Sequence, residues 1–158
     1  MRFLLDTCPS LWIAAAAAEL SQRSRELFSD PDNEVYLNFV SAWEIALRHT
    51  LRRLCLAESP GQFVPAERRR HGVEALALDE ESALHLARLP GLHRDPLGRM
   101  LVCQALVHGL VILTLDPLIT QYPVRAMWSG SPNGKSTGAS PPREIPRPFP
   151  TSRRRWGI

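Results

Sequence analysis

The chain has 158 residues, 44% hydrophobic and 22% charged, a balance typical of one soluble globular domain rather than a fibrous or disordered chain. Its longest apolar run, residues 11–18, is too short to span a bilayer, and an acid at position 6 interrupts any signal-like stretch, so we expect a cytoplasmic protein with no membrane segment. Three cysteines without paired spacing exclude a disulfide framework and a zinc site of the CxxC type.

The net charge of +3 is distributed unevenly along the chain. Residues 129–158 hold six of the 19 basic residues and one of the 16 acidic residues, which leaves 13 basic and 15 acidic residues in 1–128. The same segment holds six prolines, four glycines and seven serines or threonines. We therefore predict one folded domain over 1–128 and a disordered tail over 129–158, which either attracts nucleic acid non-specifically or has no role.

The first half of the domain alternates between strand and helix patterns. Residues 3–5 form a short apolar run with β character, and residues 10–28 hold helix formers, including five consecutive alanines. The residues of 30–33 favour a turn, 35–38 read as a second strand, and 40–54 carry apolar residues at helical spacing.

The second half repeats this alternation. We expect a helix over 60–71 that Pro65 interrupts, a strand over 73–78, and a helix over 79–89 whose first turn is acidic. Pro96 directly after Asp95 indicates the start of a helix that runs to His108. A strand at 110–114, a short helical stretch and a strand at 124–127 follow. The pattern predicts an α/β fold, with helices on both faces of a parallel sheet.

Four acids stand where such a sheet would carry its active site, beyond the carboxyl ends of the strands. Asp6 follows the first strand, Glu44 lies near the start of the helix after the second, and Asp116 follows the strand at 110–114. Asp95 opens the helix before that strand. Each acid also has an ordinary explanation, such as helix capping by Asp95, a turn at Asp116 or an exposed helix position for Glu44.

Convergent carboxylates repel one another unless a cation lies between them. Magnesium prefers oxygen ligands, often with only one or two direct carboxylates, and it suits phosphodiester hydrolysis by activating water and stabilising developing charge.

Several sequence segments together resemble the PIN-domain toxins of the VapC group: LLDT (4–7), SAWEIA (41–46), HRDP (93–96), R-x-L-x-x-Q-A-L (99–106), TLDP (114–117) and YPV (122–124). The resemblance covers residues 1 to about 128. It implies a three-layer α/β/α sandwich and an endoribonuclease that depends on Mg²⁺ or Mn²⁺. It also implies a toxin that is held by an antitoxin and forms a homodimer.

Carried over by position, the resemblance makes Asp6 and Asp116 metal ligands and places Glu44 in the acidic cluster, with Thr7 and Thr114 in support. The sequence departs from the family pattern at Gly98, where a further acid of the metal cluster is expected. Asp95, about 5 Å away along a helix axis, is the candidate to replace it as a ligand and catalytic acid.

Arg94 and Arg99 are candidates for RNA contacts, or else solvated charges at a helix end. The leading hypothesis is a ribonuclease toxin, weakened by Gly98. The alternative is an inactive PIN-fold module that binds an antitoxin or RNA. A third candidate, a receiver-like phosphoryl-transfer domain, is disfavoured because no lysine precedes Lys135.

Overall fold

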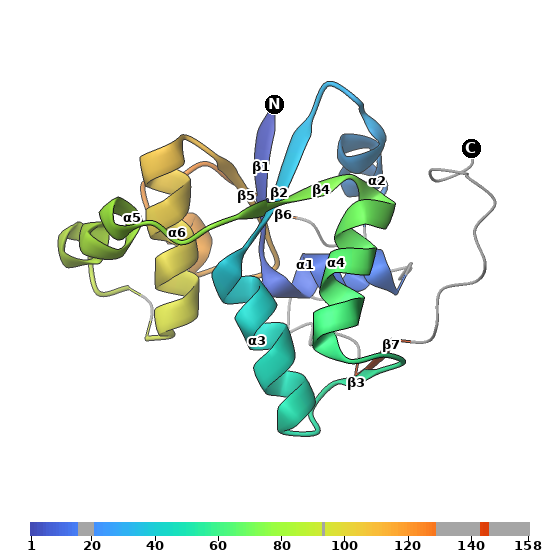
Figure 1. Ribbon diagram of the computed structural model, residues 1–158. Coiled ribbons are helices and arrows are strands. Elements are labelled where there is room, and N and C mark those ends of the chain that lie inside the picture. The colour runs from blue at the N-terminus through green and yellow to red at the C-terminus, as the bar shows by residue number, and fades with distance from the viewer. Residues whose placement is uncertain (16–20, 93, 129–142, 146–158) are drawn as a thin grey trace.

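The computed structural model describes residues 1–15, 21–92, 94–128 and 143–145. Its centre is a five-stranded sheet in the order β4-β2-β1-β5-β6, and every pairing in this sheet is parallel (Figure 1). The strands are β1 (Arg2–Leu5), β2 (Glu34–Asn38), β4 (Val73–Leu76), β5 (Val111–Thr114) and β6 (Ala126–Trp128). The predicted parallel α/β sheet is therefore confirmed.

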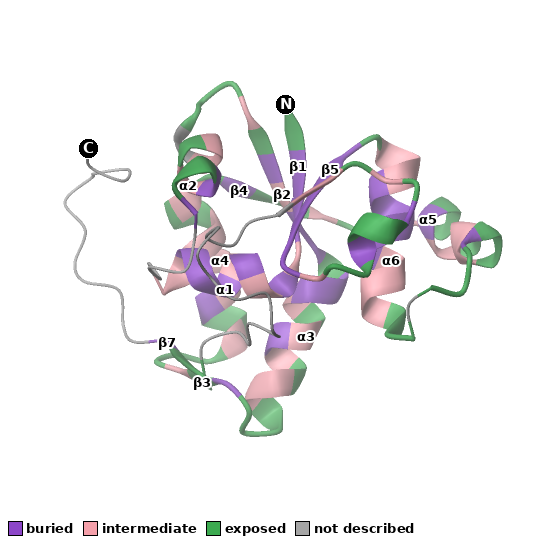
Figure 2. Ribbon diagram, turned by 180° about the vertical axis from the view of Figure 1, so that it is seen from behind, coloured by how far each residue is buried: buried purple, intermediate pink, exposed green. Residues whose placement is uncertain are grey.

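Helices cover both faces of the sheet. They are α1 (Thr7–Ala14), α2 (Gln22–Ser29), α3 (Phe39–Thr50), α4 (Pro60–His71), α5 (Glu80–His85) and α6 (Pro96–His108), with short 3₁₀ helices η1 (Leu86–Arg88) and η2 (Ile119–Gln121). Side chains alternate across β1, so Phe3 and Leu5 pack with Trp12 of α1, whereas Leu4 packs with Val102 of α6. Figure 2 shows buried residues along β1 and β5 and on α1 and α6. Two apolar layers result, one on each face, and the three-layer α/β/α sandwich is confirmed.

The central position of β1 fixes the edge at which the functional residues meet. Phe3 is in register with Val35 of β2 on one side and with Val111 of β5 on the other. Because all three strands run in the same direction, the residues that follow Leu5 and Thr114 emerge at the same edge of the sheet. Asp6 and Asp116 are thereby brought to one place.

One helix predicted over 10–28 is wrong, because two helices occupy this region. α1 begins at Thr7, where the Asp6 side chain caps it, and ends at Ala14. α2 begins after Ser21, whose hydroxyl accepts a hydrogen bond from the Ser24 N–H. The alanine run favoured a continuous helix, but propensity is a weak guide against capping and packing. Residues 16–20 lie outside the described part of the chain.

The predicted interruption at Pro65 is also wrong, since Pro65 lies inside a continuous α4. The helix runs on to His71 and ends at Gly72, whose φ of 64° suits a left-handed C-cap glycine. Proline removes one backbone donor, and here the rest of the helix tolerates that loss. None of the described helices is long and apolar enough to cross a membrane.

A second, two-stranded sheet was not predicted. β3 (Cys55–Leu56) pairs in parallel with β7 (Glu144–Ile145), so part of the segment expected to be disordered is ordered against the domain (Figure 1). The prediction of disorder is therefore wrong for these two residues, because Ile145 finds an apolar site in which its side chain is buried. Residues 129–142 and 146–158 lie outside the described chain.

Candidate active site

All four acids singled out in the sequence line one cleft of about 400 Å³ at the carboxyl edge of the sheet. Asp6 follows β1 and Asp116 follows β5, while Glu44 comes from α3 and Asp95 from the start of α6. The expected supporting residue Thr7 lines the same cleft. The rule that places sites beyond the ends of parallel strands thus brought these residues together correctly.

Asp6 is the most constrained of the four acids. One carboxylate oxygen accepts the Thr7 backbone N–H at 2.7 Å, and the other accepts the Thr114 hydroxyl at 2.7 Å. Burial raises the pKa of Asp6 to about 6, and the negative charges of Glu44 and Asp116 raise it further against the lowering effect of these hydrogen bonds. The two neighbouring acids and burial thus outweigh the hydrogen bonds that favour the charged form of Asp6.

Thr114 links the two acids that follow β1 and β5. Its side chain is fully buried, donates to Asp6, and accepts the backbone N–H of Asp116 at 2.9 Å. One oxygen of the Asp116 carboxylate accepts the Leu118 N–H at 2.8 Å, which closes a tight turn after the strand. The predicted supporting role of Thr114 thus has a definite geometry, because one hydroxyl orients both residues.

Glu44 differs from Asp6 because it has a cationic partner. One carboxylate oxygen of Glu44 accepts a hydrogen bond from the Thr7 hydroxyl at 2.6 Å. The other accepts hydrogen bonds from Nε and a terminal nitrogen of Arg48 at 2.8 and 2.5 Å. Arg48 lines the cleft, although the sequence analysis did not single it out. The signal was available in the i,i+4 spacing of Glu44 and Arg48 on one helix.

Asp95 lines the cleft but also caps α6. Its two oxygens accept the N–H groups of Leu97 at 3.1 Å and Gly98 at 3.2 Å. The helix cap expected from the sequence is confirmed, and the role of Asp95 as a metal ligand stays a prediction. Gly98 lines the cleft as well, without a side chain to contribute a ligand.

The two arginines expected to contact RNA do not line this cleft. Arg94 is exposed, whereas Arg99 is turned toward η1, with a terminal nitrogen 3.5 Å from the Leu86 carbonyl oxygen and a buried Nε that has no hydrogen-bond partner. Arg99 is thus placed to hold η1 against α6.

The donor set fits a hard cation only in part. Across the described residues, no group of three or more His, Cys, Asp and Glu side chains is arranged to hold a metal ion. Arg48 neutralises Glu44, and Asp95 uses both oxygens as a helix cap. Asp6 and Asp116 follow neighbouring strands and line the same cleft, and two carboxylates are enough for an ion that keeps most of its water.

Comparison with known proteins agrees with the segments found in the sequence. No family model matches the chain. Over 69 residues it is 33% identical to ribonuclease VapC16 of Mycobacterium tuberculosis, a match covering 44% of this chain and 49% of that protein. The matched region is therefore similar to a VapC ribonuclease. The chain spans about half the length of this curated relative.

Two solved structures are similar in fold over most of the chain. One is VapBC2 from Rickettsia felis bound to a promoter DNA fragment, at a TM-score of 0.61 and 11% identity, covering 80% of this chain and 98% of that one. The other is VapBC-1 from nontypeable Haemophilus influenzae, at a TM-score of 0.52 and 16% identity, covering 80% and 97%. At these identities the likeness is one of fold.

Cys8 is a further residue that lines the cleft. Burial, followed by the negative charge of Asp6, raises the pKa of its thiol to about 12. The thiol therefore stays protonated and is a poor nucleophile or metal ligand at neutral pH.

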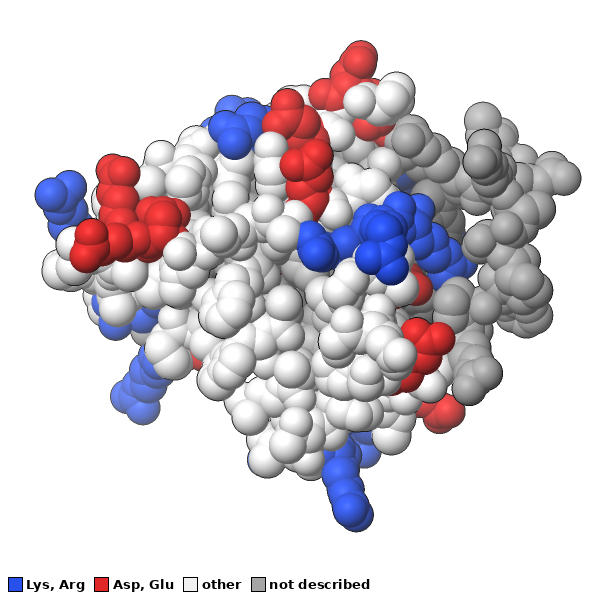
Figure 3. All heavy atoms as spheres, in the orientation of Figure 1, with Lys and Arg blue, Asp and Glu red and all other residues white. Residues whose placement is uncertain are grey.

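Figure 3 shows acidic and basic side chains in separate small groups on a mainly uncharged face, so the described residues form no continuous basic strip there.

Proposed function

We propose that this chain is a metal-dependent endoribonuclease, the toxin of a toxin–antitoxin pair, located in the cytoplasm. The observation that carries the proposal is the cleft in which Asp6 lies close to Glu44 and Asp116 with its pKa raised by burial and by their charges. The similarity to ribonuclease VapC16 supports the reaction class, because one third of the residues in the matched region are identical in the two proteins.

The residues of the chain divide into two groups in this proposal. Asp6 and Asp116 would hold Mg²⁺ or Mn²⁺, which when bound would supply positive charge for activating water and stabilising the phosphate. Thr114 orients both acids through its hydroxyl, and Thr7 holds Glu44 in the same wall of the cleft. Arg48 neutralises Glu44 and offers the cationic side chain of the cleft to a phosphate.

Cleavage of single-stranded RNA by the purified full chain tests this function. We expect cleavage with magnesium or manganese, loss of cleavage in EDTA, and a loss of at least about 100-fold in Asp6→Asn. Asp32→Asn is the matched control, because Asp32 is exposed in a turn and does not line the cleft. Equal cleavage by Asp6→Asn and the parent chain would reject the proposed role of Asp6.

A second candidate function is an inactive module that keeps the fold and binds an antitoxin or RNA. Gly98 favours it, since this position lines the cleft without a carboxylate and no ligand group of three is assembled among the described residues. Gly98→Asp separates the two functions. Cleavage that rises by roughly 10–100-fold identifies a nuclease short of one acid, whereas silence of both chains leaves the binding module.

We propose an antitoxin partner because both solved neighbours are VapBC assemblies. A homodimer is proposed on the strength of an apolar stripe on α3, formed by the exposed Phe39, Trp43 and Leu47 at intervals of four residues. Light scattering of the full chain measures this association, and a monomer at micromolar concentration would reject the homodimer.

A further inference from the structure

The two-stranded sheet attaches the chain's C-terminal segment to the body of the molecule at a place remote in sequence. β3 and β7 contribute two residues each, and the Cys55 N–H donates to the Arg143 carbonyl at 2.7 Å. A pair of strands this short is marginal in water by itself. Side-chain burial must therefore hold β7 in place.

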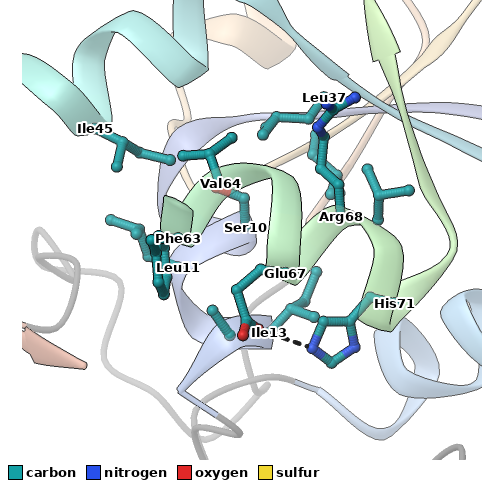
Figure 4. A pocket seen from close by; sticks show the side chains of 13 residues that line it. Ser10, Leu11, Ile13, Leu37, Ile45, Phe63, Val64, Glu67, Arg68 and His71 are labelled. Carbon is teal, nitrogen blue, oxygen red and sulfur yellow. Dashed lines mark ion pairs between the residues drawn. The ribbon is translucent and has the colours of Figure 1, made fainter. Parts of the chain in front are cut away.

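Ile145 provides that burial. Only 2% of its surface is exposed. It packs in one cluster with Leu11 of α1, Ile45 of α3, Phe63 of α4, and Leu54, which directly precedes β3. A small cavity of about 30 Å³ between the same helices shares three of these residues (Figure 4). The pocket that receives Ile145 is thus apolar and has a little unfilled space beside it.

Ile145 stands out from the residues that precede it in the C-terminal segment. Between residues 129 and 145, Ile145 is the one large apolar residue in a stretch of proline, glycine, serine and polar residues. Such a stretch has little else to bury, and a branched side chain at the paired position is what an extended segment needs to add to a strand. One isoleucine therefore distinguishes the docked residues from the rest of the segment.

We propose that β3 and the pocket of Leu11, Ile45, Leu54 and Phe63 form a docking site for an extended peptide, occupied by the chain's own Arg143–Ile145 segment. We call Arg143–Ile145 the plug, because it fills the pocket and exchanges with other peptides of the same kind. Backbone hydrogen bonds from β3 select an extended chain, and the pocket selects a branched apolar side chain. Because so few contacts hold it, the segment leaves the pocket while the sandwich stays folded.

The plug packs on two of the helices that line the candidate active site. α1 presents Thr7 to the cleft and Leu11 to the pocket, and α3 presents Glu44 to the cleft and its neighbour Ile45 to the pocket. Docking of the segment therefore adds contacts to the two helices that carry Thr7 and Glu44. This inference does not depend on ribonuclease activity, and its test uses no catalytic readout.

Hydrogen exchange of the full chain, followed by mass spectrometry, tests whether the segment is docked and separable. Ile145→Asp is expected to speed exchange at residues 54–56 by at least about tenfold, since burial of an isoleucine contributes that much or more. Ile145→Val should stay close to the parent chain. Exchange in α6 should not change in either variant, because the sandwich remains folded.

A synthetic peptide of residues 141–148 then tests exchangeability. We expect it to restore slow exchange at residues 54–56 in Ile145→Asp and to bind the parent chain more weakly, because the parent site is already occupied. The same peptide with aspartate at position 145 should do neither. Unchanged exchange in Ile145→Asp, faster exchange throughout α6, or equal peptide affinity for both chains would each overturn the proposal.

Discussion

Thr114 is the single residue on which the geometry of the candidate site depends most. Thr114→Val keeps the shape but removes the hydroxyl that donates to Asp6 and accepts from the Asp116 N–H, in a fully buried position. We expect a loss of about 1–3 kcal/mol in the free energy of unfolding, because polar groups lose partners. Urea denaturation measures this loss.

Thr120→Val is the matched control for that measurement. Thr120 is exposed, and its hydroxyl donates to the Pro117 carbonyl at 2.7 Å, so its removal should change stability by no more than about 0.5 kcal/mol. Equal losses in the two variants would show that the Thr114 hydroxyl does not hold the acids together.

The sequence predicted which acids line the cleft better than it predicted the hydrogen-bond and ionic partners of their carboxylates. Asp6, Glu44, Asp95 and Asp116 do line one cleft, since their positions at strand ends follow from the order of elements. The sequence alone does not say whether Glu44 pairs with Arg48 or binds a metal, nor whether Asp95 caps α6 or binds a metal. Each choice depends on the side-chain rotamers. Whether these acids bind a metal stays a prediction.

Asp79 joins the start of α5 to the end of α6 through its carboxylate. Asp79 accepts the Ser82 N–H and hydroxyl at 2.7 and 2.8 Å, and one oxygen lies 2.7 Å from Nε2 of His108. The Ser82 N–H, and next His108, hold the pKa of Asp79 well below its ordinary value of 3.8. The stabilisation is therefore complete above that value and is lost as pH falls toward the lowered pKa.

Asp79→Asn should accordingly unfold at lower urea concentration than the parent chain at pH 7, and the difference should shrink progressively below about pH 5. Urea midpoints at pH 7 and pH 3 measure it. Glu81→Gln serves as control, because Glu81 is exposed in the same helix turn. A difference that grows on acidification would contradict the assigned role of Asp79.

At the scale of elements, prediction succeeded where local signals agreed and failed where distant contacts decided. α6 begins at Pro96 and ends at His108 as predicted, since Asp95, Pro96 and Gly109 mark both ends. The break between α1 and α2 was missed because alanines favour helix in any context. The pairing of β3 with β7 was missed because it joins short segments about 90 residues apart, and no periodicity marks so short a strand.

The whole molecule is stabilised from the middle of its sheet. Leu4 of β1 has no exposed surface and packs against α6. We expect Leu4→Ala to lower the free energy of unfolding by about 2–5 kcal/mol, because it leaves a cavity between sheet and helix. Leu84→Ala, with 69% of Leu84 exposed, should change it by less than about 0.5 kcal/mol. Calorimetry compares the two, and similar losses would contradict a core centred on β1.

The central position of β1 also sets the order of events while the chain is being made. The hydrogen bond from Thr114 to Asp6 joins residues 108 positions apart, and β1 gains its second neighbour only when β5 is present. Such non-local pairing forms late in folding. A nascent chain on the ribosome therefore carries no assembled cleft until almost the entire domain has emerged, and fragments released early would be unable to act through it.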